Sequence, residues 1–85
     1  MTSARPPAGL LRNVPTRRIA QALERDNFSF TERQGSQRIY RHGDGRRVVI
    51  HYHRSTDTLT SYVLRNLLAG TRWTEDDLRR LKLVK

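Results

Sequence analysis

The strongest constraint on the fold lies in residues 28–53, where short strand-like segments are separated by glycine turns. The first segment alternates apolar and polar residues, and the last is rich in β-branched residues at Val48, Val49 and Ile50. Such segments predict an antiparallel sheet joined by tight turns. We expect three strands over residues 28–31, 37–42 and 46–53, with turns at 34–36 and 43–45.

The second turn predicts how the last two strands pair. Asp44 and Gly45 form the pair favoured in a two-residue type I′ hairpin. With that loop, Ile39 lies opposite Ile50 and Gln37 lies opposite Tyr52. This pairing determines which residues share each face of the hairpin. The expected core face holds Ile39, Val48 and Ile50. The expected open face holds Arg38, Tyr40, Val49 and His51, with His53 at its end.

Helical patterns flank the strands on both sides. Residues 17–25 carry an apolar stripe of helical period, and Thr16 is the expected cap. A second helix begins at Thr60 or Ser61, and Gly70 is its expected stop. A short helix after Thr74 has acidic residues in its first turn, as well as a predicted hydrophobic staple between Trp73 and Leu78.

The predicted fold is α+β with the order α-β-β-β-α, helices on one sheet face and a short extra C-terminal helix. Double-stranded-RNA-binding domains share this order. Residues 1–15 hold all three prolines and no clear period, so they predict a flexible N-terminal tail before a domain of residues 16–85. The chain has no cysteine and no apolar run near the roughly 20 residues of a membrane span, and we expect a cytoplasmic protein.

The charge is concentrated rather than spread evenly. The formal net charge is +9, and residues 37–54 hold five arginines, three histidines, two tyrosines and a single acid. Cations bind phosphate, aromatic rings stack on bases and imidazole transfers protons, so RNA is the expected partner. The candidate RNA-binding residues are Gly35, Ser36, Arg38, Tyr40, Arg41, Arg46, Arg47, His51, His53 and Arg54.

Each of these candidates also has a structural interpretation. The arginines can form a solvated face, and Tyr40 can pack across the sheet against Val49 instead of stacking on a base. His51 and His53 have a spacing seen in metal sites, but no third ligand is apparent. We therefore predict no metal and no cofactor.

Several short motifs occur in an order that resembles the HicA family of toxins, and also YcfA-like small basic proteins. They are Leu-Glu-Arg-Asp at 23–26, Phe-Ser-Phe at 28–30, Arg-Gln-Gly-Ser at 33–36, Ile-Tyr-Arg-His at 39–42, His53 and the Leu-rich segment 59–68. The resemblance implies an mRNA interferase, a metal-independent endoribonuclease that inhibits translation. It also implies an antitoxin partner of HicB type that masks the active site.

The resemblance places the catalytic histidine directly after Gly-Ser, where this chain has Gln37. A carboxamide does not exchange protons near neutral pH. Three explanations stand: a deliberate change, natural loss of catalysis, or use of His51 or His53 instead. The alternatives to an interferase are a non-catalytic RNA-binding module of the same fold and a protein-binding domain with an acidic partner.

Overall fold

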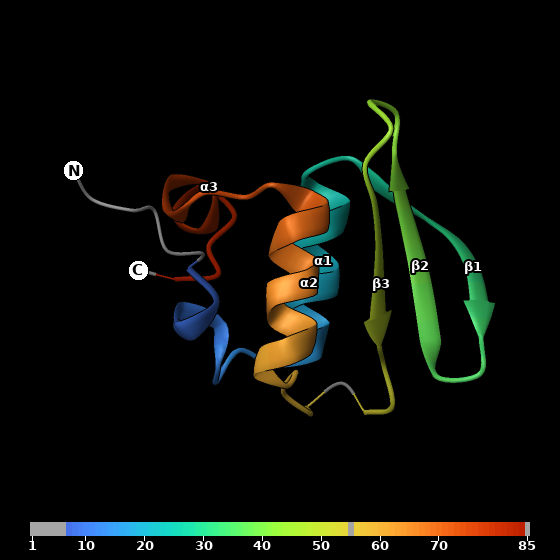
Figure 1. Cartoon of the computed structure of the whole chain (residues 1–85), viewed down its shortest axis with the longest axis horizontal. Coiled ribbons are helices and arrows are strands. Elements are labelled where there is room, and N and C mark those ends of the chain that lie inside the picture. Colours follow the sequence, from blue (N-terminus) through green and yellow to red (C-terminus); the bar gives the residue numbers. More distant parts are fainter. Residues whose placement is uncertain (1–6, 55, 85) are drawn as a thin grey trace.

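The computed structural model describes residues 7–54 and 56–84 of the chain. Its elements are η1 (Pro7–Leu11), α1 (Thr16–Arg25), β1 (Phe28–Gln34), β2 (Gln37–His42), β3 (Arg47–His51), α2 (Ser61–Thr71) and α3 (Glu75–Arg80). The strands form one antiparallel sheet in the order β1-β2-β3. The predicted α+β class and the order α-β-β-β-α are therefore confirmed (Figure 1).

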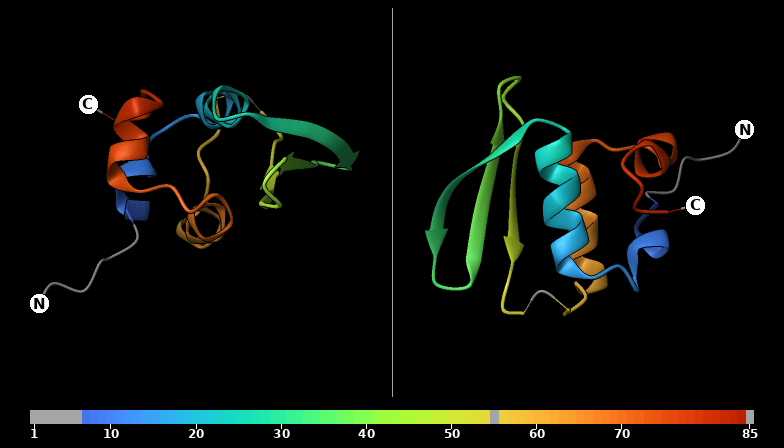
Figure 2. Two further views of the ribbon diagram at one scale, coloured as in Figure 1. Left: turned by 90° about the horizontal axis from the view of Figure 1, so that it is seen from above. Right: turned by 180° about the vertical axis from the view of Figure 1, so that it is seen from behind.

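The elements are arranged in three layers. Helices α1 and α2 stand side by side between the sheet and a third layer formed by η1 and α3, as both views of Figure 2 show. Helix α1 contacts β1, whereas α2 contacts both β3 and η1. Within residues 7–54 and 56–84, no helix has the length and apolar character needed to cross a membrane.

One apolar cluster fills the space between these layers and draws on every helix and strand. Its largest fully buried side chains are Leu11, Ile19, Leu23, Tyr40, Ile50, Leu64, Leu67 and Leu78. No side-chain nitrogen or oxygen that is buried in the described residues lacks a hydrogen-bond partner.

The segment expected as a tail belongs to the domain. From Pro7 onward the chain forms η1, and Ala8, Leu11 and Val14 are buried in the core. This part of the prediction was wrong because η1 covers the side of α2 that faces away from the sheet. The first six residues of the expected tail lie outside the described residues.

Two helix ends differ from the prediction. Pro15, not Thr16, is the N-cap of α1, and the Thr16 hydroxyl instead donates to the Asp57 carbonyl oxygen at 2.7 Å. Helix α2 continues through Gly70 to Thr71, and its C-cap, Arg72, adopts a left-handed conformation with φ 62°. Helix α3 begins directly after Thr74, as expected, and Thr74 and Asp77 form a reciprocal capping box there.

The loop between β2 and β3 has three residues instead of the expected two. The backbone N–H of His42 donates to the Arg46 carbonyl at 2.8 Å, so residues 43–45 form the loop. Gly45 ends it with φ 100°, a conformation that glycine adopts without strain. A type I turn followed by such a glycine is a common hairpin connection.

This extra loop residue shifts the strand pairing by one position. Ile39 pairs with Val49, Tyr40 with Val48 and Arg38 with Ile50. Directly opposed residues on neighbouring strands share a face. A shift of one residue in the pairing therefore places each side chain of one strand on the opposite face relative to the other strand. The predicted register was therefore wrong, and so were the faces assigned to Ile39, Arg38 and Tyr40 in β2. Val48 and Ile50 of β3 are buried in the core, as expected.

Candidate functional site

The face of the sheet turned away from α1 and α2 carries three cross-strand rows, which we call the open face. The rows are Ser29–Arg41–Arg47, Glu32–Ile39–Val49 and Gln34–Gln37–His51. A bulge between Phe30 and Glu32 brings the β1 members into these rows, and the Thr31 hydroxyl donates to the Ile39 carbonyl there at 3.2 Å. The open face therefore has arginines at one end and amide and imidazole groups at the other.

Gln37 is placed on the open face by a tight turn. Gly35 and Ser36 form a two-residue connection between β1 and β2, and Gly35 has φ 60°. Glycine at the first position of such a connection is typical of a type II′ turn. The turn makes Gln37 the first residue of β2 and pairs it with Gln34. This Gly-Ser pair thus sets the position of residue 37 at the end of the sheet.

Gln37 lies directly opposite His51 on β3. Backbone hydrogen bonds form on either side of this pair, from Tyr52 N–H to the Ser36 carbonyl at 2.7 Å and from His42 N–H to Arg46. Hydrogen-bonded pairs alternate along an antiparallel ladder, so Gln37 and His51 form a non-hydrogen-bonded pair, in which side chains are closest. The predicted placement of Gln37 opposite Tyr52 was therefore wrong.

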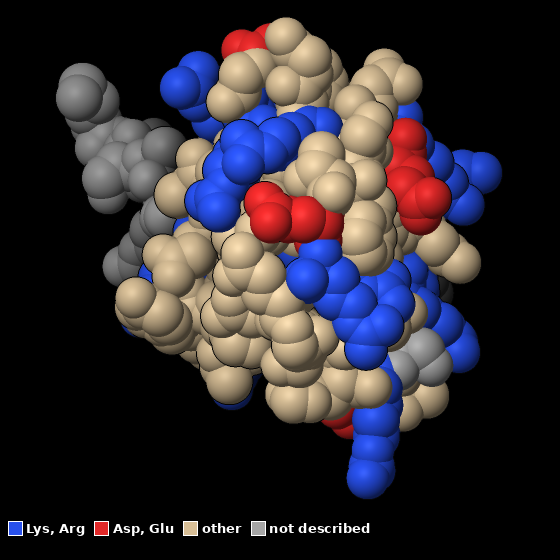
Figure 3. Space-filling view, turned by 90° about the vertical axis from the view of Figure 1, so that its right-hand side faces the viewer, with Lys and Arg blue, Asp and Glu red and all other residues tan. Residues whose placement is uncertain are grey.

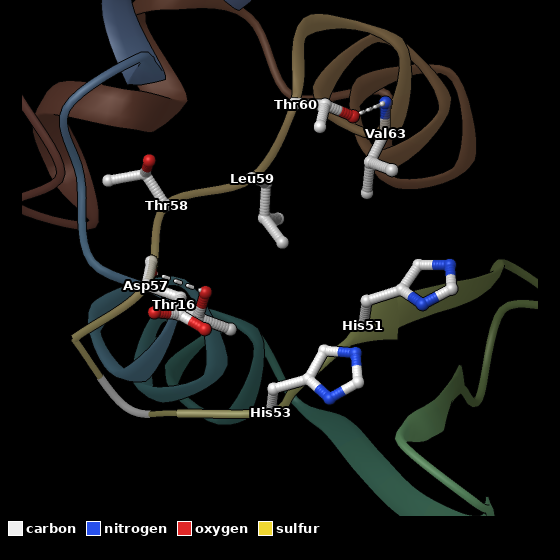
Figure 4. Close-up of a pocket in the computed structure, with 8 residues that line it drawn as sticks. All are labelled: Thr16, His51, His53, Asp57, Thr58, Leu59, Thr60 and Val63. Atoms are coloured by element: carbon white, nitrogen blue, oxygen red, sulfur yellow. Dashed lines mark hydrogen bonds between the residues drawn. The ribbon is translucent and has the colours of Figure 1, made fainter.

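His51 also lines a cavity at the C-terminal end of β3. The cavity has a volume of about 340 Å³, and its lining includes His53, Leu59 and Val63 (Figure 4). The rings of His51 and His53 lie on its β3 side, and the Leu59 side chain points into the space opposite them. Both histidines are exposed to solvent. One site thus combines two imidazoles with an apolar wall.

The loop that forms this wall is held to the start of α1. Both the backbone N–H and the hydroxyl of Thr16 donate to the Asp57 carbonyl, and Pro15 forms an isolated β-bridge with Thr58. Leu59 is buried, and Thr60 caps α2 by accepting from the Val63 N–H. Sequence reasoning did not assign these residues to the site, because tertiary contacts with the start of α1 bring them beside β3.

Three of the candidate arginines are available to a ligand. Arg41 and Arg47 are exposed on the open face, and Arg54 is exposed in the loop after His53. Arg41 also lies 4.0 Å from the Glu32 carboxylate. Figure 3 views the molecule from the β1 side and shows Lys and Arg side chains spread around smaller acidic groups.

Arg46 instead contacts the folded chain, with a side chain only 18% exposed. It forms ion pairs with Asp44 at 2.8 Å and Asp26 at 3.6 Å, and it donates to the Thr71 carbonyl. Its guanidinium also lies 4.9 Å from the centre of the Phe28 ring. These contacts leave Arg46 little freedom to bind a phosphate.

Arg38 also lies away from the open face, contrary to the prediction. It pairs with Ile50 on the helix side of the sheet, and its guanidinium lies 3.8 Å from the Tyr52 ring centre and 5.4 Å from that of Phe30. Tyr40 is on the same side and is only 1% exposed, so its ring is not accessible to a base. Burial raises the pKa of Tyr40 above its usual value.

The remaining histidine is separate from this site. His42 lies on the helix side, edge-on to Phe28 at 5.0 Å, and its Nδ1 accepts the Asp44 backbone N–H at 3.1 Å. Among the described residues, no group of three or more His, Cys, Asp or Glu side chains is placed to hold a metal ion.

The fold and site together define a small α+β protein of double-stranded-RNA-binding-domain type, with polar and imidazole groups on its open face. The family described as "HicA toxin of bacterial toxin-antitoxin" has a model that matches residues 16–71, about two thirds of the chain. The chain therefore belongs to the HicA toxin family, as its motifs predicted, and membership implies an antitoxin partner. No curated protein matches the chain as a relative.

Proposed function

We propose that this toxin acts on RNA, as an endoribonuclease that inhibits translation by cutting mRNA. The observation that carries the proposal is the position of residue 37, on the open face immediately after the Gly35–Ser36 turn. The resemblance of the chain to its family assigns the catalytic histidine to this position. Gln37 keeps a group there that can hydrogen-bond to a phosphate oxygen or a base edge.

In this proposal RNA lies along β2 and β3 on the open face. Arg41 and Arg47 bind phosphates at one end, while Gln37 and His51 contact the reacting nucleotide at the other. Arg54 extends the basic surface beyond β3. Charge neutralisation of this kind supports binding without sequence preference and weakens as salt rises.

The antitoxin in this proposal is a HicB-type protein that covers the same open face. Ile39 and Val49 lie at the centre of that face, between rows of polar side chains. Ile39 is already buried and Val49 is half-buried, so a protein partner would bind mainly to the polar rows on either side of them and block RNA there. RNA and antitoxin are therefore expected to compete for binding.

The test is cleavage of a long single-stranded RNA in EDTA by the chain and by its Gln37→His variant. We expect the variant to cut RNA, because the substitution places an imidazole at the end of the open face. Both proteins should bind RNA in a salt-dependent manner. If both proteins bind RNA but neither cuts it, the chain is a non-catalytic RNA-binding module; if neither binds, a protein-binding role replaces both.

A further inference from the structure

We infer that His51 and His53 form the proton-transfer pair of this chain and supply on β3 the imidazole chemistry that Gln37 does not. This inference rests on the proposed function, because it names the groups that would cleave RNA on the open face. It differs from that proposal in predicting that the chain cuts RNA without any substitution at position 37.

The first argument is the position of His51. In the observed register His51 is the cross-strand neighbour of Gln37, in a non-hydrogen-bonded pair. The Cα atoms of such pairs are about 4.5 Å apart, and their side chains are closer than in the alternate pairs. An imidazole on His51 can therefore reach nearly the same space as an imidazole at position 37, with Gln37 as a hydrogen-bonding neighbour.

The second argument is the shared cavity. His51 and His53 both line it, their rings lie on the same side of it, and both are exposed (Figure 4). Leu59 and Val63 form the apolar part of the lining. A nucleobase needs an apolar contact surface with polar groups at its edge, and this cavity offers both. A nucleotide bound there would place its ribose and phosphate beside the two imidazoles.

The chemistry requires one proton acceptor and one proton donor. His51, as neutral imidazole, takes the proton of the ribose 2′-hydroxyl while the 2′ oxygen forms a bond to phosphorus. The bond between phosphorus and the 5′ oxygen breaks, and His53, as imidazolium, gives its proton to that leaving oxygen. The products are a 2′,3′-cyclic phosphate and a 5′-hydroxyl, and exchange with water restores both histidines.

The carboxamide of Gln37 has a different task in this scheme. It neither gains nor loses a proton near neutral pH, and it can donate an N–H to a non-bridging phosphate oxygen. That oxygen gains negative charge as the 2′ oxygen attacks, so the hydrogen bond strengthens in the transition state. At the end of the open face, His51 would then accept the proton and Gln37 would stabilise the negative charge.

The test compares the unsubstituted chain with His51→Gln and His53→Gln in single-turnover cleavage of a short single-stranded RNA, in EDTA. We expect the chain to release cyclic phosphate and 5′-hydroxyl products. Each substitution should slow cleavage by about 10²- to 10⁴-fold, the usual contribution of a general acid or base. Affinity for the RNA, measured by fluorescence anisotropy, should fall by much less than the rate, and the melting temperature should stay unchanged.

The matched control is His42→Gln, which removes the remaining histidine of the chain from the helix side of the sheet. This variant should cut RNA at the rate of the unsubstituted chain. Because it is purified in the same way as the other proteins, it also serves as a control for contaminating nucleases. His51→Ala tests proton transfer directly, because free imidazole added to the reaction should restore part of its rate.

Three results would overturn the inference: cleavage by His51→Gln at the unsubstituted rate, equal loss in His42→Gln, or no cleavage by the unsubstituted chain. These outcomes are distinct from failure of the proposed function. If only Gln37→His cuts RNA, the chain keeps the RNA-cleaving scaffold of the proposed function and the pair on β3 is not its catalyst. If no protein in the series cuts RNA, both proposals fail.

Discussion

Gly70 of α2 lies so close to Val48 of β3 that a Cβ on residue 70 would be 2.6 Å from the Val48 Cγ1 atom. The same Cβ would lie 2.8 Å from the Arg47 carbonyl oxygen. Gly70 was expected to end its helix, yet the helix continues past it. The glycine instead permits the close approach of α2 to the edge of the sheet.

Gly70→Ala should therefore destabilise the protein, although alanine is the better helix former by about 1 kcal/mol. Overpacking of this kind costs about 1–3 kcal/mol, and the clash involves backbone as well as side chain. Urea denaturation measures the loss. Gly9→Ala is the matched control, because a Cβ there meets no atom within 4 Å. Equal stability of the Gly70→Ala variant would show that α2 can move away from β3 freely.

A second prediction concerns Asp26, the hydrogen-bond acceptor that links the end of α1 to the C-terminal helix α3. Asp26 accepts the Trp73 indole N–H at 2.7 Å and an Arg80 N–H at 3.1 Å. Asp26→Ala leaves the buried indole N–H without a partner, which costs about 1–3 kcal/mol. The free energy of unfolding in guanidinium is the measurement. Asp76→Ala, whose carboxylate is 95% exposed, should change it by less than about 0.5 kcal/mol.

A third prediction follows from the capping box of α3. The Thr74 backbone N–H donates to Asp77 at 2.9 Å and holds the pKa of that carboxyl below its usual range. Because the folded pKa is depressed, this stabilisation is present above the unfolded pKa of about 4 and is lost as pH falls through the folded value.

Asp77→Asn should accordingly melt at a lower temperature at pH 7, with a loss of about 1 kcal/mol. The difference should shrink below about pH 4. Thermal melts of both proteins from pH 7 to pH 2 measure it, and Asp76→Asn controls for removal of one charge from the same turn. A difference that stays constant across this range would contradict the assignment.

The register of β2 and β3 can be tested by cross-linking, because the chain has no cysteine of its own. Cysteines at positions 37 and 51, introduced together, should form a disulfide under mild oxidation, since they occupy directly opposed sites. Cysteines at positions 37 and 52 should remain reduced, because those side chains lie on opposite faces. Mass spectrometry without reductant distinguishes the two registers.

The arginines of the open face give the prediction for RNA. Arg41→Gln and Arg47→Gln should each weaken binding of single-stranded RNA and reduce the slope of log affinity against log salt by about one. Arg79→Gln is the control, because Arg79 lies on α3 and pairs with Glu75 at 2.6 Å. An equal effect of all three substitutions would indicate attraction by net charge alone.

The order of helices and strands could be predicted from the sequence because each element has its own period of apolar residues. The strand pairing could not, because Gly43-Asp44-Gly45 suits both a two-residue and a three-residue loop. The conformation of Gly45 decides between them, and the choice exchanges Tyr40 and Ile39 between the faces of the sheet. The bulge at Thr31 similarly has no signal in local composition.

The sequence predicted which residues belong to the candidate site better than it predicted how they are arranged. Gln37, His51 and His53 were all singled out by residue type, but their proximity depends on the register. Leu59 and Val63 were missed because their position follows from tertiary contacts of the loop before α2. Tyr40 was misplaced because a tyrosine in a strand looks the same in sequence whichever face it occupies.

The loop at residues 43–45 sits at the far end of the sheet from Gln37 and His51 (Figure 1). Its length nevertheless selects which β3 residue stands beside position 37. If the same sequence formed a two-residue loop at Asp44-Gly45, Tyr52 instead of His51 would lie opposite position 37, with every functional side chain still present in the sequence. Members of such a family can therefore share all their motifs and still differ in active-site partners, so the hairpin tip must be aligned before chemistry is transferred between them.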